Sequence, residues 1–138
     1  MYSRILVPVE LTEKDRRAVA AARDLVSGPD AEVTLLHVIE TLDLPFEEME
    51  DFYARLEERA KRVLDDLAEE LSASGVDVVQ RIVFGARVPE IVACGRESRA
   101  ELVVLAARKV DPESASGAWS GIAYQTAVLC PMSVLLLK

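Results

Sequence analysis

The chain has 138 residues, of which 51% are hydrophobic and 29% are charged, with a formal net charge of −8. This length favours a single domain over residues 1–138, and the acidic balance argues against non-specific nucleic-acid binding, which needs cations to neutralise phosphates. No charged-then-apolar leader opens the chain and no apolar run approaches the ~18 residues of a membrane span, so we expect a cytoplasmic protein without a membrane span.

The first elements predicted along the chain are a strand, a helix and a second strand. RILVPVE at residues 4–10 is a nearly continuous apolar run, which is typical of a strand covered on both faces. The helix that follows begins at Thr12, a residue type favoured as an N-cap, and ends at the turn residues 28–30. EVTLLHVIE at residues 32–40 is the second predicted strand.

A long helix is predicted next, over about residues 45–73. Apolar residues recur there at three- and four-residue steps, Phe52 and Tyr53 among them, and predict one buried face. The other face carries acidic and basic clusters typical of a solvated helix surface. Glu57, Glu58, Asp65 and Asp66 therefore read as solvated residues rather than metal ligands.

The last part of the chain repeats the alternation. A strand at residues 76–84 precedes a helix at about residues 88–98, and a buried strand follows at residues 101–106. The fourth helix follows Ser120 and ends before Pro131. Residues 133–138, SVLLLK, form the final predicted strand.

This alternation predicts an α/β fold, with an open parallel sheet, right-handed crossovers and helices on both faces. Such sheets bind ligands beyond the carboxyl ends of their strands, where the strand order reverses. A ligand-binding site is therefore expected among residues 9–12, residues 38–41 and the chain from Ala106 onward.

Several of these segments together resemble the universal stress protein family. RILVPVELTE, LLHVIE, Gly85 before the third helix, ELVVLAAR and CPMSVLLLK carry the resemblance, which covers essentially the whole chain. The resemblance implies a single-domain, Rossmann-like, five-stranded parallel sheet in the order 3-2-1-4-5. It also implies a homodimer through the last strand, residues 133–138, which suits an apolar edge strand able to pair with its own copy.

Some family members bind ATP through a loop of the form G-x-x-G-x9-G-[ST], and others lack this loop. Glycines allow the backbone to approach phosphate oxygens, and the final Ser or Thr stands at a helix N-terminus. In this chain the three glycine positions of the loop fall on Ala106, Lys109 and Trp119, so none of them holds a glycine. Arg108 and Ser120 keep the loop's cation and its hydroxyl.

The first two strands give a similarly mixed match. Where the family usually has Val-Asp-Gly-Ser, this chain has Val9, Glu10, Leu11 and Thr12. Glu10 keeps a carboxylate for a ribose or an adenine, whereas Leu11 replaces a turn glycine and is expected to narrow the mouth of the cleft. Val38 matches the position at which the family contacts adenine.

The sequence allows two interpretations of the loop after residues 101–106. In one, Arg108, Lys109 and the helix start at Ser120 bind an anion through side chains. In the other, Leu11 and Trp119 fill the volume of the nucleotide and the cations are solvated. The candidate nucleotide cleft consists of Pro8, Val9, Glu10, Val38, Ala106, Arg108, Ser120 and Gly121.

Other reactive side chains are few. His37 is the only histidine and lies within a predicted strand, where a structural role is expected. Cys94 and Cys130 stand far apart in sequence and read as small buried hydrophobic residues.

The favoured hypothesis is a homodimeric regulatory module of stress response, without catalysis or a bound cofactor, whose nucleotide cleft is degenerate. The alternatives are a switch that binds ATP or AMP, and a weak ATPase. The sequence does not identify a protein partner.

Overall fold

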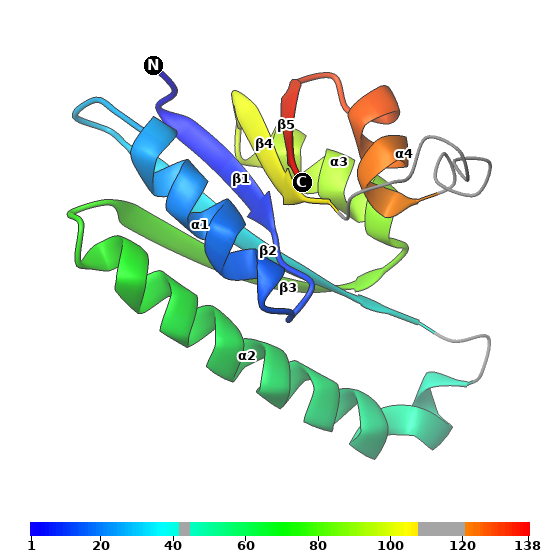
Figure 1. The fold of residues 1–138 in the computed structure, drawn as a ribbon. Coiled ribbons are helices and arrows are strands. Elements are labelled where there is room, and N and C mark those ends of the chain that lie inside the picture. The colour runs from blue at the N-terminus through cyan, green and yellow to red at the C-terminus, as the bar shows by residue number, and fades with distance from the viewer. Residues whose placement is uncertain (42–44, 108–120) are drawn as a thin grey trace.

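The computed structural model describes residues 1–41, 45–107 and 121–138, in which strands and helices alternate along the chain (Figure 1). The strands are β1 (Arg4–Pro8), β2 (Glu32–Glu40), β3 (Asp77–Gly85), β4 (Leu102–Ala106) and β5 (Ser133–Leu137). The helices are α1 (Lys14–Leu25), α2 (Glu50–Ser72), α3 (Arg87–Glu97) and α4 (Ile122–Leu129), with a 3-10 helix η1 (Phe46–Met49) directly before α2.

The strands form one parallel sheet in the order β3-β2-β1-β4-β5, as predicted. The chain runs outward from β1 through β2 to β3 and then crosses to β4 on the other side of β1. The strand order therefore reverses between β1 and β4, and the carboxyl ends of these two strands mark the expected ligand position.

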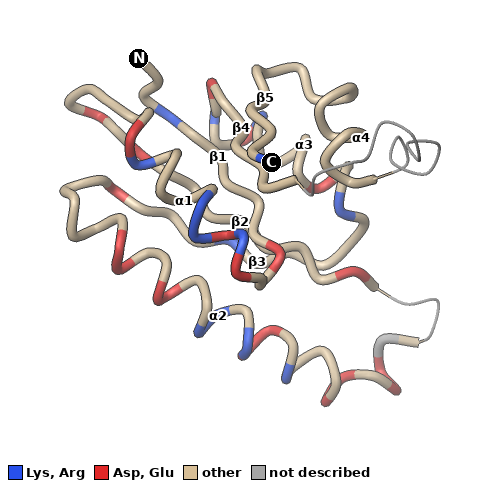
Figure 2. The backbone as a smooth tube through the Cα atoms, in the orientation of Figure 1, with Lys and Arg blue, Asp and Glu red and all other residues tan. Residues whose placement is uncertain are grey.

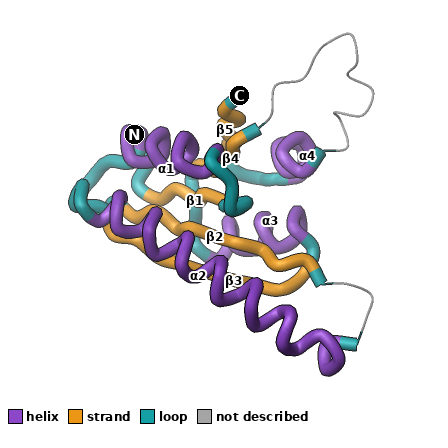
Figure 3. Tube along the Cα trace, turned by 60° about the horizontal axis from the view of Figure 1, so that its bottom comes forward, coloured by secondary structure: helices purple, strands orange, loops and turns teal. Residues whose placement is uncertain are grey.

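Helices cover both faces of the sheet, as the predicted fold requires (Figure 3). Because successive side chains of a strand point to opposite faces, β1 sends Ile5 and Val7 to one core and Leu6 to the other. The first core is completed by α1 and α2, and the second by α3 and α4. The central strand β1 is thus buried on both sides.

The long helical pattern is divided between η1 and α2. Tyr53 is 1% exposed, and its ring meets Phe84 of β3 edge-on at a centroid distance of 5.8 Å. Phe52 is 37% exposed, so its predicted place on the buried face is wrong. Adjacent helical residues point about 100° apart, since a turn takes 3.6 residues, and Tyr53 takes the inward position.

Charged residues follow the outer side of α2 (Figure 2). Glu57, Glu58, Asp65 and Asp66 are all exposed there. Within residues 1–41, 45–107 and 121–138, no cluster of His, Cys, Asp and Glu is arranged to hold a metal ion. No helix in the described part of the chain is long and apolar enough to cross a membrane.

Candidate functional site

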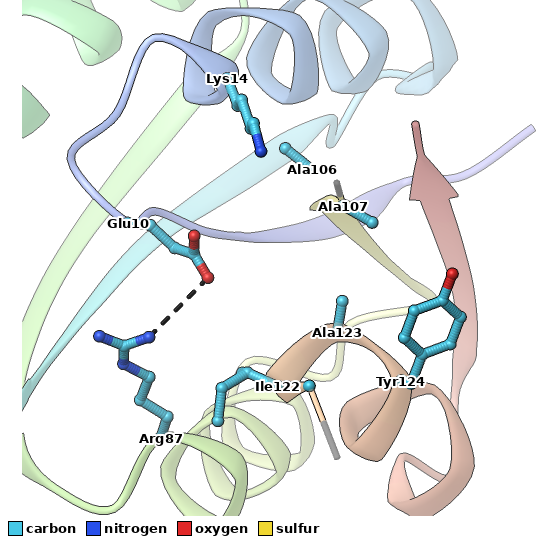
Figure 4. Close-up of a pocket in the computed structure, with 9 residues that line it drawn as sticks. Glu10, Lys14, Arg87, Ala106, Ala107, Ile122, Ala123 and Tyr124 are labelled. Carbon is cyan, nitrogen blue, oxygen red and sulfur yellow. Dashed lines mark ion pairs between the residues drawn. The ribbon is translucent and has the colours of Figure 1, made fainter. Parts of the chain in front are cut away.

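A cavity of about 320 Å³ lies at the carboxyl ends of β1 and β4, where the strand order reverses (Figure 4). We call it the outer pocket. This volume is at the lower end of the range for small-molecule sites. The outer pocket is lined by Glu10, Lys14, Arg87, Ala106, Ala107, Gly121, Ile122, Ala123 and Tyr124.

The charged residues of the outer pocket come from three different connections. Glu10 follows β1, Lys14 is the first residue of α1, and Arg87 is the first residue of α3. Glu10 lies between the two cations in Figure 4. The described lining therefore carries two positive charges and one negative charge, an arrangement that accepts an anionic group better than a cationic one.

A second hollow, the inner slot, adjoins the outer pocket and shares Glu10, Arg87 and Ile122 with it. Its volume is only about 20 Å³, enough for roughly one water molecule. The surface that it exposes is mostly apolar, although three of its lining residues are polar or charged. The slot is lined by Pro8, Val9, Glu10, Leu36, His37, Val38, Arg87, Ile91, Leu105 and Ile122.

Arg87 joins the carboxyl ends of β1 and β2 through two ion pairs, which we call the Arg87 bridge. Its Nε lies 3.2 Å from Oε1 of Glu40, and its Nη1 lies 4.0 Å from Oε1 of Glu10. All three side chains are about half exposed, so each pair is weak on its own. Sequence reasoning missed Arg87 because it considered the ends of the first, second and fourth strands but not the connection after the third.

The turn from β1 into α1 is held by a buried carboxylate. Asp15 is 3% exposed, and its oxygens accept hydrogen bonds from the backbone N–H of Glu10 at 3.0 Å and of Thr12 at 2.9 Å. Burial raises the pKa of Asp15, against the opposing effect of these N–H groups. The prediction that Thr12 caps the helix is wrong. Glu13 holds the N-cap position without a side-chain hydrogen bond, and Asp15 ties the turn instead.

Leu11 adopts a φ of 63°, the left-handed region in which the resemblance would place a glycine. For a residue with a Cβ this conformation costs roughly 1–2 kcal/mol. The Leu11 side chain packs against the core beneath α1 and α2, beside Val63 and Leu67, and does not line the outer pocket. The prediction that Leu11 narrows the cleft is therefore wrong, because the turn aims this side chain toward α2.

The histidine and both cysteines have structural surroundings. Nδ1 of His37 lies 2.7 Å from the carbonyl oxygen of Val9, the distance at which an Nδ1–H donates to that oxygen. Cys94 is buried and Cys130 is half-buried, and burial raises the pKa of both thiols. A raised pKa disfavours the reactive thiolate.

The structure brings most of the predicted cleft residues to one edge of the sheet. Pro8, Val9 and Val38 line the inner slot, and Glu10 lines both hollows. Ala106 and Gly121 line the outer pocket. Arg108 and Ser120 lie outside the described residues, as do Lys109 and Trp119. That this set binds a nucleotide stays a prediction.

The chain matches known proteins along nearly its whole length. The model of the universal stress protein family matches residues 1–135. The solved structure of the hypothetical protein MJ0577 aligns with a TM-score of 0.85 and 24% identity, over 100% of this chain and 96% of that chain. None of the curated proteins compared with the chain matches it.

Two further solved structures hold a nucleotide. A universal stress protein in complex with cAMP aligns with a TM-score of 0.76 and 18% identity, over 99% of this chain and 97% of that chain. The universal stress protein from Archaeoglobus fulgidus in complex with dAMP aligns with a TM-score of 0.71 and 16% identity, over 99% of this chain and 98% of that chain. At these identities the likeness is one of fold.

The role of Asp15 in holding the β1–α1 turn is testable by substitution. Asp15→Ala leaves the backbone N–H groups of Glu10 and Thr12 without their acceptor, and we expect it to lower the free energy of unfolding by about 1–3 kcal/mol. Asp24→Ala is the matched control, because Asp24 lies exposed on the same helix. Denaturant unfolding measures both variants, and equal stability of the two would refute the role.

Proposed function

The chain belongs to the universal stress protein family, and from this premise we propose that it is a non-catalytic, homodimeric regulatory module of the cytoplasmic stress response whose nucleotide cleft is closed. The observation that carries the proposal is the volume of the inner slot. At about 20 Å³ it holds roughly one water molecule and has no room for a nucleobase. Small-molecule sites usually offer at least about 300 Å³.

The residues around the slot support the closed cleft. Val9, Val38 and Leu105 are each 7% exposed or less and are packed into the two cores, so they do not withdraw easily. Arg87 also lines the slot and is paired with two carboxylates. A nucleobase would have to displace this side chain to reach Val38.

The chemistry of the described lining supports a role without catalysis. Among the described residues that line the two hollows, His37 is the sole imidazole, and its Nδ1 is engaged by the carbonyl of Val9. The carboxylate of Glu10 is paired with Arg87. A general base needs a free proton-accepting atom within hydrogen-bond reach of its substrate. Pairing with Arg87 stabilises the charged form of Glu10 and so disfavours its taking up a proton, and His37 lines only the inner slot, whose volume of about 20 Å³ leaves no room for a substrate.

A nucleotide-binding switch, with or without weak ATPase activity, is the second candidate. The outer pocket favours it, because this cavity has about 320 Å³ and carries Lys14 and Arg87. Structural neighbours in complex with cAMP and dAMP show that this fold accommodates adenine nucleotides. In this alternative, the nucleotide would change the affinity of the module for its partner.

Self-association is proposed through the β5 edge of the sheet. β5 pairs with β4 on one side only and has no partner strand on the other within the described chain. The preceding helix α4 exposes Val128 by 80% and Leu129 by 62%, which leaves apolar surface beside this edge. An edge strand next to exposed apolar side chains is a surface that a second copy can cover.

The closed cleft predicts no thermal stabilisation by nucleotide. A ligand at 100 times its dissociation constant stabilises its protein by about 2.7 kcal/mol, so we expect no increase in Tm with millimolar ATP and Mg²⁺. A clear increase would favour the switch. Steady release of phosphate that is lost in Arg108→Ala would favour the ATPase.

The proposed dimer predicts a sedimentation-equilibrium mass twice the chain mass of 15.2 kDa. Val128→Glu combined with Leu129→Glu should shift the mass toward the monomer, because it places charge in the contact. Val79→Glu is the control, since Val79 is 39% exposed on β3 at the opposite edge. A monomeric wild type, or dissociation by the control alone, would contradict the proposed surface.

A further inference from the structure

We propose that Arg87 controls access to the inner slot: the Arg87 bridge keeps the slot closed to planar ring systems, and release of Arg87 opens it. The inference rests on the proposed function, because it names the side chain that keeps the cleft closed. If Arg87 controls access, the inner slot is closed reversibly and has not been lost as a cavity.

The position of Arg87 places it where the two hollows meet. It is the first residue of α3 and lines both the outer pocket and the inner slot. Its guanidinium is held from two directions, by Glu40 at 3.2 Å and by Glu10 at 4.0 Å. Glu40 ends β2 and Glu10 follows the neighbouring strand β1, so the bridge places the Arg87 side chain beside the end of β1. Figure 4 shows its pair with Glu10.

Three apolar walls of the slot are fixed by the core. Val9, Ile91 and Leu105 are 3%, 3% and 5% exposed, and each belongs to one of the two packed cores. Moving them would disturb close packing, which is costly. Arg87, by contrast, has a side chain that is 40% exposed and belongs to neither core, so its movement into solvent would open no void in either core. Moving Arg87 therefore costs less than moving any of these three apolar walls.

The nature of the slot defines the ligand that release would admit. Most of its walls are aliphatic, and the hollow next to it carries Lys14 and shares Glu10 with the slot. An apolar cleft with polar groups at its mouth suits a flat heteroaromatic ring that keeps its polar edge toward the outer pocket. Adenosine is the suitable probe, because it carries the ring without a phosphate that would itself attract the two cations.

The strength of the bridge sets the expected size of the effect. An exposed ion pair changes an equilibrium by at most about fivefold. Glu40→Gln removes the shorter pair and should raise adenosine affinity by up to about fivefold. Arg87→Ala removes both pairs and the side chain itself, and should raise it by roughly tenfold or more. Added salt should narrow these differences, because it screens the pairs while the probe is uncharged.

The experiment is isothermal titration calorimetry of the wild type, Glu40→Gln, Arg87→Ala and Arg96→Ala with adenosine. Arg96 is the matched control, an exposed arginine on the same helix that lines neither hollow. Thermal unfolding of each variant first establishes that it is folded. The expected order of affinity is Arg87→Ala, then Glu40→Gln, then the wild type, with Arg96→Ala equal to the wild type.

The outcomes separate this inference from the proposed function. If Arg87→Ala binds and the wild type does not, both stand. If the wild type binds and Arg87→Ala binds more tightly, control by Arg87 stands and the closed cleft fails. If no variant binds, the closed cleft stands and control by Arg87 fails. Equal binding by the wild type and Arg87→Ala overturns both.

Discussion

Burial of the central strand on both faces is the constraint on which the site depends. β1 sends alternate side chains into the two cores, and Ile5, Leu6 and Val7 are each at most 1% exposed. A strand buried in this way meets solvent only at its ends. Because the sheet is parallel, the carboxyl end of β1 opens at the same edge as those of β2 and β4. The outer pocket and the inner slot both lie at this edge.

The turn after β1 shows how this edge is kept in place. Asp15 accepts two backbone hydrogen bonds from the turn, and Leu11 adopts a left-handed conformation that directs its side chain toward α2. Glu10 is thereby left at the mouth of both hollows, where it meets Arg87. The two hollows consequently differ in character, since one is roomy and charged whereas the other is apolar and nearly full. In the proposed function, the outer pocket stays accessible while the inner slot is closed to a nucleobase.

The sequence predicted the frame of the fold better than the details of the site. Continuous apolar runs and helical periodicity indicated the five strands and four helices, and the family resemblance implied the strand order. The alternation brought Pro8, Glu10 and Val38 to one edge, as expected.

Local preferences were less informative where a tertiary contact decided the outcome. The buried carboxylate of Asp15 replaced Thr12 as the group that ties the turn, and the ring of Phe84 favoured Tyr53 over Phe52. Arg87 was missed because a long side chain reached from one strand end to two others, a contact that no local pattern encodes.

We propose that the cleft of the wild-type protein is closed to adenine nucleotides. The most direct measurement is the nucleotide content of the purified protein, obtained by denaturing it and analysing the extract by absorbance and chromatography. A closed cleft predicts an extract without adenine nucleotide. An amount of ATP, AMP or a related nucleotide that approaches one per chain would contradict it.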